Sequence, residues 1–578
     1  MRRRVPGWQR PWVQAALLGA FTLALGLVYQ FSPAVVPTEE GLAVEATAEG
    51  LIGNDAYYHV RMAYLYRTGE VQEAGEHFHW TQESLWADDF ANKDYLFHRY
   101  LAPFTLLADD ADDTAGLIIA GRIGAAVLLS LLVVVLYSVM RGLGVRGAWL
   151  FAAGLFAVGG GTLALRYGMC RSFLMSVPFA LLGWWAILLR RYAWLAVVAC
   201  GYTLAYTASH LLLALVLVRG VVDAVMGGDG RQGEGRKAAL WRDAGLLAAA
   251  AGGIAIGAVL HPGTANLLQL WWVQNVVVLA LAQEGGWPFL QAINEALGLG
   301  PAVQPTHPLR LGNELDAPGI SSALQGSTAL LIGPLVMAAL AAVLRAVPSR
   351  QALLSLVVAC LLVAAYLLSF RFIEYAAPFM VLVLALWFRD LAQHPRFRAW
   401  LQGDLARRVS LVRLIAGLAV AASVSNVLSG VYRDASAGRM EALEAGEWLR
   451  RHAGEERQLV WHDRWDYFPM LFFEAPNHDY LVGLDPTFSY VADPERHNLR
   501  RRIVDGEEAD FIGALREDFA ADYVLATLED AKDFRERLAA YAEAGALREA
   551  ARGGAGEEGE GGEDSYEGWV IYEVIDER

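Results

Sequence analysis

Apolar residues are gathered into long blocks, and this constrains the fold more than any other feature of the sequence. Many blocks run for roughly 17–25 residues, the length that a helix needs to cross the hydrocarbon core of a bilayer. Hydrophobic residues make up 55% of the 578-residue chain. This fraction is high for a soluble protein but low for one buried wholly in lipid, so we expect an α-helical polytopic membrane protein with large polar parts.

Hydropathy predicts about eleven transmembrane helices. They are expected near residues 12–36, 115–140, 147–165, 172–189, 192–207, 210–226, 242–260, 327–346, 350–369, 371–388 and 411–430. The first block follows a basic start but is long for a signal peptide, so we interpret it as a retained helix. The segment 267–282 is apolar but short and contains amide side chains, which favours an interfacial or re-entrant helix.

Arginine-rich short loops determine the orientation, because such loops stay on the cytoplasmic side. With eleven spans they all fall on one side: Arg2–Arg4, Arg141, Arg146, Arg190, Arg191, the loop 230–237, Arg345, Arg350 and the run 389–408. The N-terminus is then cytoplasmic. The first outer loop (37–113), the long outer loop (261–325) and the C-terminal part face outward from a bacterial or archaeal plasma membrane.

The chain divides into a membrane domain, residues 1–430, and an outward-facing part, residues 431–578. Helical and strand-like segments alternate in the second part, which predicts a small α/β domain. Residues 553–565 form an acidic low-complexity stretch that we expect to be disordered. The three cysteines all lie in apolar blocks, and no basic face is evident, so neither a disulfide framework nor nucleic-acid binding is expected.

The stretch GNDAYYHVRMAYLYRTGEV, residues 53–71, places polar groups beside the first span. Asp55 opens a predicted helix, and an acid at a membrane interface is often kept for function, although a solvated acid near a helix start is the alternative. Arg61 lies on one face with aromatic neighbours, while Tyr58 and His59 lie elsewhere around the helix. This set could form an interfacial belt, or it could hold a phosphate and a sugar ring.

A second acidic group follows in SLWADDFANKDYLFHRY, residues 84–100. Asp88, Asp89, Asp94 and His98 are side chains that can bind a hard cation, but their spacing is not diagnostic. A solvated amphipathic helix is the favoured interpretation. Asp94 remains a candidate for an additional polar site together with Tyr58 and His59.

Three further segments carry candidate groups. Arg371 and Glu374 stand at the outer end of a late span, where an Arg can snorkel or hold a lipid-linked phosphate. Glu314, in the long outer loop, would alone be taken for an ordinary loop acid. Trp465, Asp466 and Tyr467 form an aromatic–acid–aromatic cluster, which either binds a polar ligand or makes a structural turn.

Taken together, these segments resemble the catalytic subunit of oligosaccharyltransferase, within the GT-C class of polyprenyl-phosphate-dependent membrane glycosyltransferases. NDAYYHVR is similar to the family's first-loop motif, and Asp55 matches its acid. The resemblance implies that Glu314 is the catalytic acid of the long loop and that Arg371 contacts the donor phosphate. RWDYF supplies Trp465, Asp466 and Tyr467 of the family's acceptor-reading signature.

The chain also departs from the family pattern. The loop after the third span reads LRYGMCRSF and lacks the acids of the family's second metal motif. Arg464 and Phe468 replace the first Trp and the Gly of the acceptor-reading signature. These differences favour the GT-C class over the specific oligosaccharyltransferase reaction.

The resemblance implies an inverting glycosyltransferase that moves a sugar or oligosaccharide from a polyprenyl-(pyro)phosphate donor to an acceptor, such as protein Asn, outside the membrane. Asp55 and Glu314 would be catalytic and would share a divalent cation, Mg²⁺ or Mn²⁺. Arg371 and Arg61 would bind the donor phosphate. The alternatives are a GT-C enzyme with a lipid, glycan or Ser/Thr acceptor, and a non-catalytic membrane assembly or transport protein.

Overall fold

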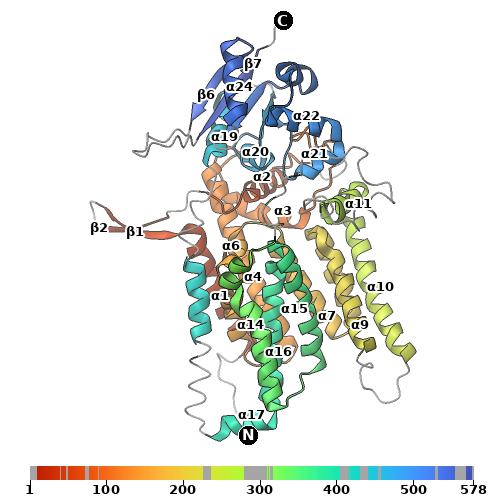
Figure 1. Cartoon of the computed structure of the whole chain (residues 1–578). Coiled ribbons are helices and arrows are strands. Elements are labelled where there is room, and N and C mark those ends of the chain that lie inside the picture. Colours follow the sequence, from red (N-terminus) through yellow and green to blue (C-terminus); the bar gives the residue numbers. More distant parts are fainter. Residues whose placement is uncertain are drawn as a thin grey trace.

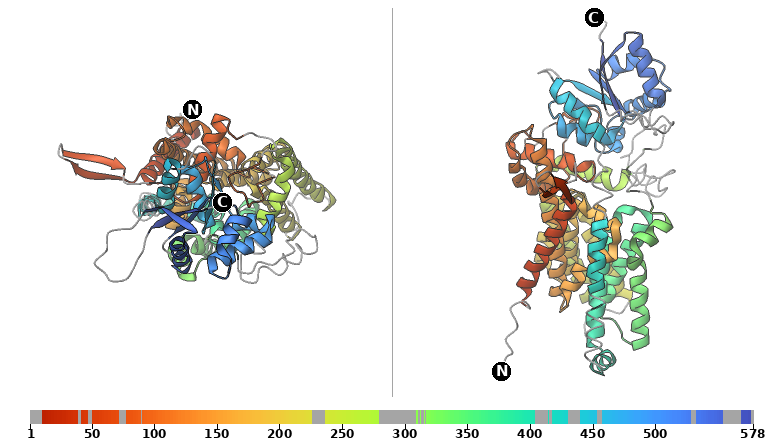
Figure 2. Two further views of the ribbon diagram at one scale, coloured as in Figure 1. Left: turned by 90° about the horizontal axis from the view of Figure 1, so that it is seen from above. Right: turned by 90° about the vertical axis from the view of Figure 1, so that its left-hand side faces the viewer.

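The computed structural model has a bundle of long helices capped at one end by a small α/β domain (Figure 1). It describes residues 10–38, 41–46, 50–71, 77–88, 90–225, 236–278, 309, 312, 315, 317–403, 414, 417–429, 440–452, 457–527, 532–553 and 568–575. Figure 2 shows that the bundle is elongated and that the C-terminal domain lies beyond one end of it. The predicted fold class, a helical polytopic bundle with a C-terminal α/β sheet, is confirmed.

All eleven segments predicted to span the membrane contain a helix. The bundle consists of α1 (Pro11–Phe31), α4 (Thr114–Gly142), α5 (Ala148–Ala153), α6 (Leu155–Gly168), α7 (Phe173–Leu188), α8 (Tyr192–Ala205), α9 (Leu211–Val225), α10 (Arg236–Leu260), α14 (Ile320–Leu344), α15 (Arg350–Leu368), α16 (Ile373–Gln393) and a helix at 417–429. Within the described ranges, eight helices are long and apolar enough to cross a membrane, and those at 173–188, 192–205 and 417–429 are shorter. In the predicted interfacial segment, α11 (Thr264–Trp272) lies across the end of the bundle (Figures 1 and 2).

The first helix is shorter than predicted. It ends at Phe31 because Ser32 adopts a left-handed conformation, with φ of 41°, and Pro33 cannot donate a helical hydrogen bond. The remaining apolar residues form strand β1 (Pro33–Thr38), which pairs with β2 (Gly41–Ala46) as an antiparallel hairpin. The hairpin projects sideways from the outer end of α1 (Figure 1).

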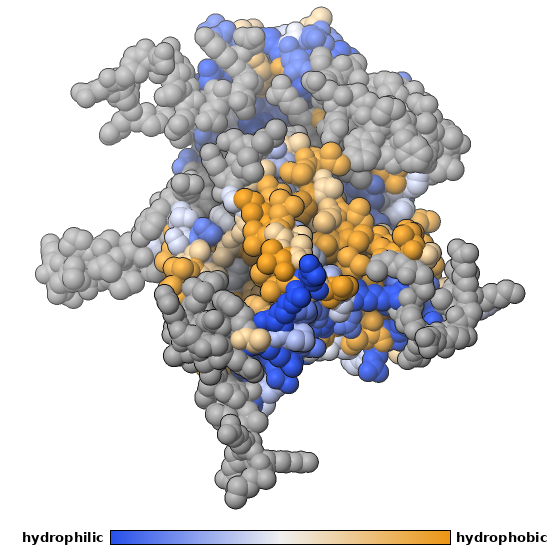
Figure 3. All heavy atoms as spheres, turned by 60° about the horizontal axis from the view of Figure 1, so that its bottom comes forward, coloured by the Kyte–Doolittle hydropathy of each residue, from blue (hydrophilic) through white to orange (hydrophobic). Residues whose placement is uncertain are grey.

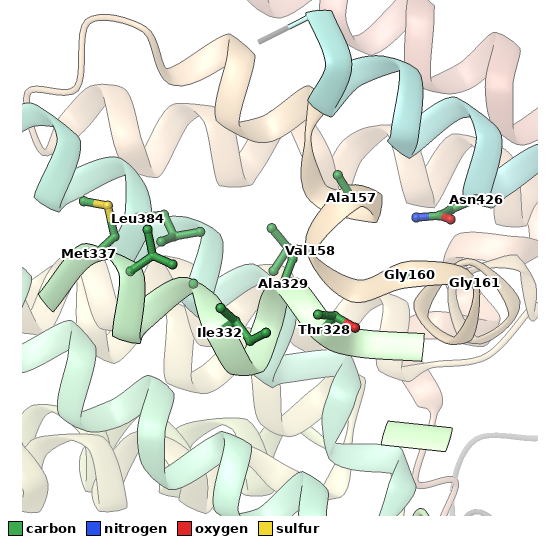
Figure 4. A pocket seen from close by; sticks show the side chains of 12 residues that line it. Ala157, Val158, Gly160, Gly161, Thr328, Ala329, Ile332, Met337, Leu384 and Asn426 are labelled. Carbon is green, nitrogen blue, oxygen red and sulfur yellow. The ribbon is translucent and has the colours of Figure 1, made fainter. Parts of the chain in front are cut away.

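A kink in α6 opens a cavity inside the bundle. Gly160 has φ of 67° there, which glycine tolerates without strain. Asn426 donates to the carbonyl of Phe156 at 2.8 Å, and the backbone N–H of Ala157 donates to Ser423 Oγ at 2.9 Å. Side chains of the 417–429 helix thus satisfy backbone groups next to the kink, as a lipid environment requires. The cavity measures about 540 Å³ and is lined mainly by small and apolar residues of α6 and α14 (Figure 4).

Among the arginines predicted to share one side, those in the described ranges include Arg190, Arg350 and Arg389, at the bundle end away from the C-terminal domain. Arg389 donates to the carbonyl of Leu143 and, at 2.7 Å, to Ser349 Oγ, so it joins α16 to two inter-helix segments. Arg190 and Arg350 both approach Asp223 of α9. Figure 3 shows apolar side chains over much of the bundle and hydrophilic ones toward this end. Such a distribution agrees with a bundle that crosses a bilayer.

The segment that follows Asp55 is buried rather than exposed. It forms α2 (Asp55–Thr68), in which every residue from Ala56 to Tyr66 is buried. Neighbouring α3 (Tyr95–Leu101) is largely buried too, which corrects the expectation of a solvated helix for this acidic segment. Both helices lie between the bundle and the C-terminal domain (Figure 1), and polar side chains such as His59, Arg61 and His98 are buried there.

The C-terminal domain is built on a five-stranded mixed sheet of order β4-β3-β5-β7-β6. The strands are β3 (Leu459–His462), β4 (Asp479–Tyr480), β5 (Tyr523–Thr527), β6 (Leu547–Gly553) and β7 (Trp569–Val574). The helices include α19 (Met440–His452), α20 (Phe468–Glu474), α21 (Pro486–Ala492), α22 (Pro494–Asp505) and α24 (Lys532–Glu543). Predicted strands at 457–463, 479–486, 522–527 and 568–575 overlap β3, β4, β5 and β7.

The first outer loop is joined to the edge of this sheet. Thr81 forms a parallel bridge with Tyr480 of β4, and the N–H groups of Gln82 and Glu83 donate to the carbonyls of Tyr480 and Leu481 at 3.0 and 2.8 Å. A strand edge that would otherwise expose unpaired backbone groups is therefore covered by residues from far along the chain.

Arg61 links α2 to the C-terminal domain. Its side chain has no exposed surface, and Nε donates to the carbonyl of Phe473 at 2.7 Å while Nη1 donates to that of Ala111 at 2.8 Å. The guanidinium also lies over the Phe473 ring. This placement differs from the predicted role in binding a donor phosphate, since the side chain already satisfies carbonyl groups inside the protein.

Replacing Arg61 by Met should therefore destabilise the junction rather than only weaken donor binding. Two buried carbonyl groups would lose a donor, and each loss costs about 1–3 kcal/mol. We expect a clearly lower melting temperature for the detergent-solubilised protein. Arg451→Met is the control variant. The Arg451 side chain is 65% exposed in an ion pair with Glu447, and such a pair contributes at most about 1 kcal/mol. Equal melting temperatures for the two variants would contradict the proposed linking role.

Candidate functional site

Asp55 occupies the first turn of α2 and forms an ion pair with Arg171. The two side chains are 25% and 21% exposed, so the pair is partly open to the outside. Arg171 belongs to the loop between α6 and α7, the loop in which the family resemblance predicts acids. A guanidinium therefore faces the carboxylate at the place where a metal would be expected.

The segment before α2 contacts the C-terminal domain beside this pair. Asn54 Nδ2 donates to the backbone carbonyl of Asp466 at 3.3 Å. Two predicted site segments, around Asp55 and around Asp466, are thus brought together although they are far apart in the sequence. The sequence alone does not predict this contact.

Two residues of the cluster at 465–467 pack inside the C-terminal domain, although their residue types indicated a binding cluster. It forms a short 3₁₀ helix in which Tyr467 is buried and Trp465 packs against the core of the C-terminal domain. Asp466 pairs with Arg464, with Nε and Oδ1 3.2 Å apart. Arg464 stands where the family signature has a Trp, so this substitution gives the carboxylate an internal partner.

Two buried carboxyl groups, those of Asp94 and Asp485, interact electrostatically with cations near Asp55 and α16. Burial raises the pKa of Asp94, while Lys93 and Arg171 act in the opposite direction. Burial likewise raises the pKa of Asp485, while Lys93 and Arg371 act against it. Lys93 thus interacts electrostatically with both carboxyl groups.

Arg371 lies in a short 3₁₀ helix, Phe370–Phe372, at the start of α16. One of its nitrogens, Nη2, donates to the hydroxyl of Tyr206 at 3.0 Å, and the side chain is partly exposed. Asp485, near Arg371, accepts from Gln274 of the segment after α11 at 3.3 Å. Residues from the bundle, from the long outer loop and from the C-terminal domain meet here.

Glu374, one turn after Arg371, serves a different purpose. It forms a buried ion pair with Arg166, the two side chains being 2% and 3% exposed, and Tyr167 Oη donates to its backbone carbonyl at 2.5 Å. The pair fixes the outer end of α6 against α16. It therefore positions the loop that carries Arg171.

The remaining predicted residues fall into two groups. Tyr58 is buried among aromatic rings, including Trp86 and Phe468, and packs rather than lines an open site. His59, Asp94 and His98 come together as a buried group whose potential ligand atoms all lie within 4.8 Å of one another. Glu314 lies outside the described residues.

Comparison with solved structures identifies the class of fold. The apo oligosaccharyltransferase of Archaeoglobus fulgidus matches with a TM-score of 0.58 and 12% identity, covering 89% of this chain and 69% of that one. The same enzyme tethered to an acceptor peptide with an NVT sequon matches with a TM-score of 0.57 and 13% identity, covering 90% and 69%. ArnT from Cupriavidus metallidurans matches with a TM-score of 0.50 and 14% identity, covering 97% and 98%.

The chain therefore has the fold of the GT-C membrane glycosyltransferases, as the sequence resemblance predicted. No protein-family model matches the sequence. No curated protein matches it either. At 12–14% identity the structural likeness fixes the fold, and the reaction has to be argued from the site.

Sequence reasoning missed Arg171 and Lys93. Both are basic residues in loops whose acidic residues alone were interpreted as possible ligands. The loop after the third span has no acid but contains Arg171, and a cation in that loop can pair with Asp55. His98 was noticed, yet its approach to His59 depends on the packing of α3 against α2.

The Arg166–Glu374 pair gives a test of how the site is held. Replacing Glu374 by Ala would leave Arg166 buried without its carboxylate, which typically costs about 3–5 kcal/mol. We expect a lower melting temperature for this variant. The double variant Arg166→Met, Glu374→Leu should recover most of the loss, because an apolar pair of similar volume removes the unpaired charge. A double variant no more stable than Glu374→Ala would contradict this role.

Proposed function

We propose that this protein transfers a sugar or oligosaccharide from a polyprenyl-phosphate donor to an acceptor on the outer side of the membrane. The observation that carries the proposal is the ion pair between Asp55 and Arg171, with Lys93 and Arg371 nearby. These residues join a carboxylate to a set of cations just outside the bundle. The GT-C fold supports the same class of reaction.

The donor phosphate is held by Arg371 with help from Lys93. The planar fork of Arg matches phosphate oxygens, and Tyr206 already fixes one side of the guanidinium. Lys93 adds a point charge on a flexible stem, 22% exposed. Arg61 has no part in this role. The two cations stabilise the leaving phosphate as the bond to the sugar breaks.

Asp55 acts on the acceptor nucleophile as hydrogen-bond acceptor or general base, and attack from the opposite face of the sugar inverts its configuration. Arg171 holds the carboxylate in a fixed direction. The Mg²⁺ or Mn²⁺ implied by the family resemblance would need Asp55 together with Glu314. Because a guanidinium already binds Asp55, the described residues do not fit that cation, and no step is assigned to it.

The isoprenoid chain of the donor fits the cavity beside the α6 kink. The cavity is walled by apolar side chains such as Ile332, Val336 and Leu384, and by the backbone of Gly160 and Gly161 (Figure 4). A hydrocarbon chain gains by burial in such a space while its phosphate stays at the outer end.

The acceptor is the finer question. Trp465, Asp466 and Tyr467 were predicted to bind an acceptor Asn sequon, but Tyr467 is buried and Asp466 is paired with Arg464. These contacts favour the alternative acceptors, a lipid, a glycan or a Ser/Thr hydroxyl, over protein Asn. We therefore propose glycosyl transfer with a non-sequon acceptor as the primary activity, and transfer to Asn as the second candidate.

Removing the carboxylate of Asp55 tests the proposal. With a polyprenyl-linked sugar donor and a panel of sequon peptide, lipid and hydroxyl acceptors, Asp55→Asn should lower the transfer rate at least about 100-fold, because a general base or strong acceptor is lost. Asp88→Asn is the matched control, since its side chain is 93% exposed in the same outer loop. Full activity of Asp55→Asn would remove this residue from the mechanism, and transfer to the sequon peptide alone would favour the second candidate.

The role of Arg171 can be tested separately. Because Arg171 supplies the positive charge beside Asp55, we expect adding or omitting Mg²⁺ or Mn²⁺ to change the initial rate by less than about two-fold. Arg171→Ala should reduce kcat much more than it changes KM for the donor, whereas Arg371→Ala should mainly raise that KM. A wild-type rate that depends strongly on Mg²⁺ or Mn²⁺ would contradict the assignment.

A further inference from the structure

Two histidines and an aspartate come together below Asp55, although they come from separate segments. His59 lies on α2, Asp94 directly precedes α3 and His98 lies on α3. All three are buried, and their potential ligand atoms lie within 4.8 Å of one another. Nδ1 of His59 and Nε2 of His98 are 2.8 Å apart.

Asp94 is the member of this group that calls for a ligand. Its side chain has no exposed surface, and its partners are a hydrogen bond with Ser172 and a salt bridge with Lys93, whose Nζ lies 3.9 Å from Oδ2. These two partners leave acceptor sites of the carboxylate unused, and buried charges are normally fully paired or bound to metals.

We infer that His59, Asp94 and His98 bind a single zinc ion that fastens α3 to α2. Two imidazole nitrogens and one carboxylate oxygen are a usual zinc ligand set, and the fourth position would be taken by water. Tetrahedral ligands at about 2.0–2.1 Å require the two nitrogens to be about 3.3 Å apart, so a small opening of the present contact is enough. The inference does not depend on the proposed transferase activity, and the three ligands do not include Asp55 or Glu314.

Neighbouring groups fit this assignment with one adjustment. Nδ2 of Asn92 lies 2.8 Å from Nδ1 of His98 and 2.8 Å from the hydroxyl of Tyr66. When Nε2 of His98 binds the metal, Nδ1 carries the proton, so the Asn92 amide has to rotate and present its oxygen. This rotation gives up the hydrogen bond that Oδ1 of Asn92 accepts from the N–H of Asp94 at 3.1 Å. Lys93, being 22% exposed, can direct its ammonium group to solvent once the metal neutralises Asp94.

The zinc would position the catalytic end of α2. His59 lies one helical turn after Asp55 on the same helix, so a bond from His59 to α3 limits how α2 can tilt. The ion would also remove the unfavourable burial of Asp94. It acts here as a structural ion and takes no part in bond making or breaking.

Metal analysis of the full-length protein tests the inference. The protein is produced in zinc-supplemented medium, purified in detergent without a polyhistidine tag, and analysed by inductively coupled plasma mass spectrometry. We expect about one zinc per chain, and its loss in His98→Gln and in Asp94→Asn. His452→Gln is the matched control, because His452 is exposed and distant from the site, and it should keep the zinc. Wild-type protein without zinc, or variants that keep as much as the wild type, would overturn the inference.

A second variant covers the case in which the Gln or Asn variants fail to fold. His98→Cys keeps a zinc ligand, so the protein should remain monodisperse on size exclusion and retain its metal. When loaded with Co²⁺, this variant should show a thiolate-to-cobalt charge-transfer band that the wild type lacks. A folded, cobalt-treated variant without the band would overturn the inference, whereas absence of transferase activity would leave the zinc result unaffected.

Discussion

The burial of α2 between the helix bundle and the C-terminal domain is the constraint on which the rest of the site depends. A helix with this many polar side chains is stable there only because each charge meets a specific partner. Arg61 satisfies carbonyl groups of both neighbouring parts, and Asp55 meets Arg171 at the open end of the helix. Asp94 and the two histidines are buried where α2 packs against α3.

Much of the fold could be predicted because long apolar blocks and arginine-rich loops are local properties of the sequence. The eleven helical segments and the α/β character of the C-terminal part follow from such patterns. The end of α1 could not be placed, since its apolar residues continue unchanged into β1. The burial of α3 was missed for a related reason: its charges are typical of a solvated face, and only the arrival of the C-terminal domain encloses them.

The candidate site shows the same division between local and distant information. Short motifs predict Asp55 and Arg371 as site residues. In the structure, Asp55 interacts electrostatically with Asp94, and Arg371 with Asp485, while Lys93 interacts with both of these buried carboxyl groups. Arg171 completes this set of charged residues, yet no motif named it. The residue types of Trp465–Tyr467 indicated a binding cluster. Arg464, which stands where the family signature has a Trp, instead forms an ion pair with Asp466. One different residue beside the motif thus changes what the motif can bind.

The contact between the first outer loop and the sheet edge also has a consequence for biogenesis. Arg61 bonds to a residue 412 positions later, and Thr81 pairs with Tyr480. During synthesis the first loop is therefore made long before its partners. Until the C-terminal domain has been made and folded, α2 lacks the contacts that bury it and the site is unassembled. The order of synthesis thus acts as a checkpoint, because the site closes only after the C-terminal domain has been added.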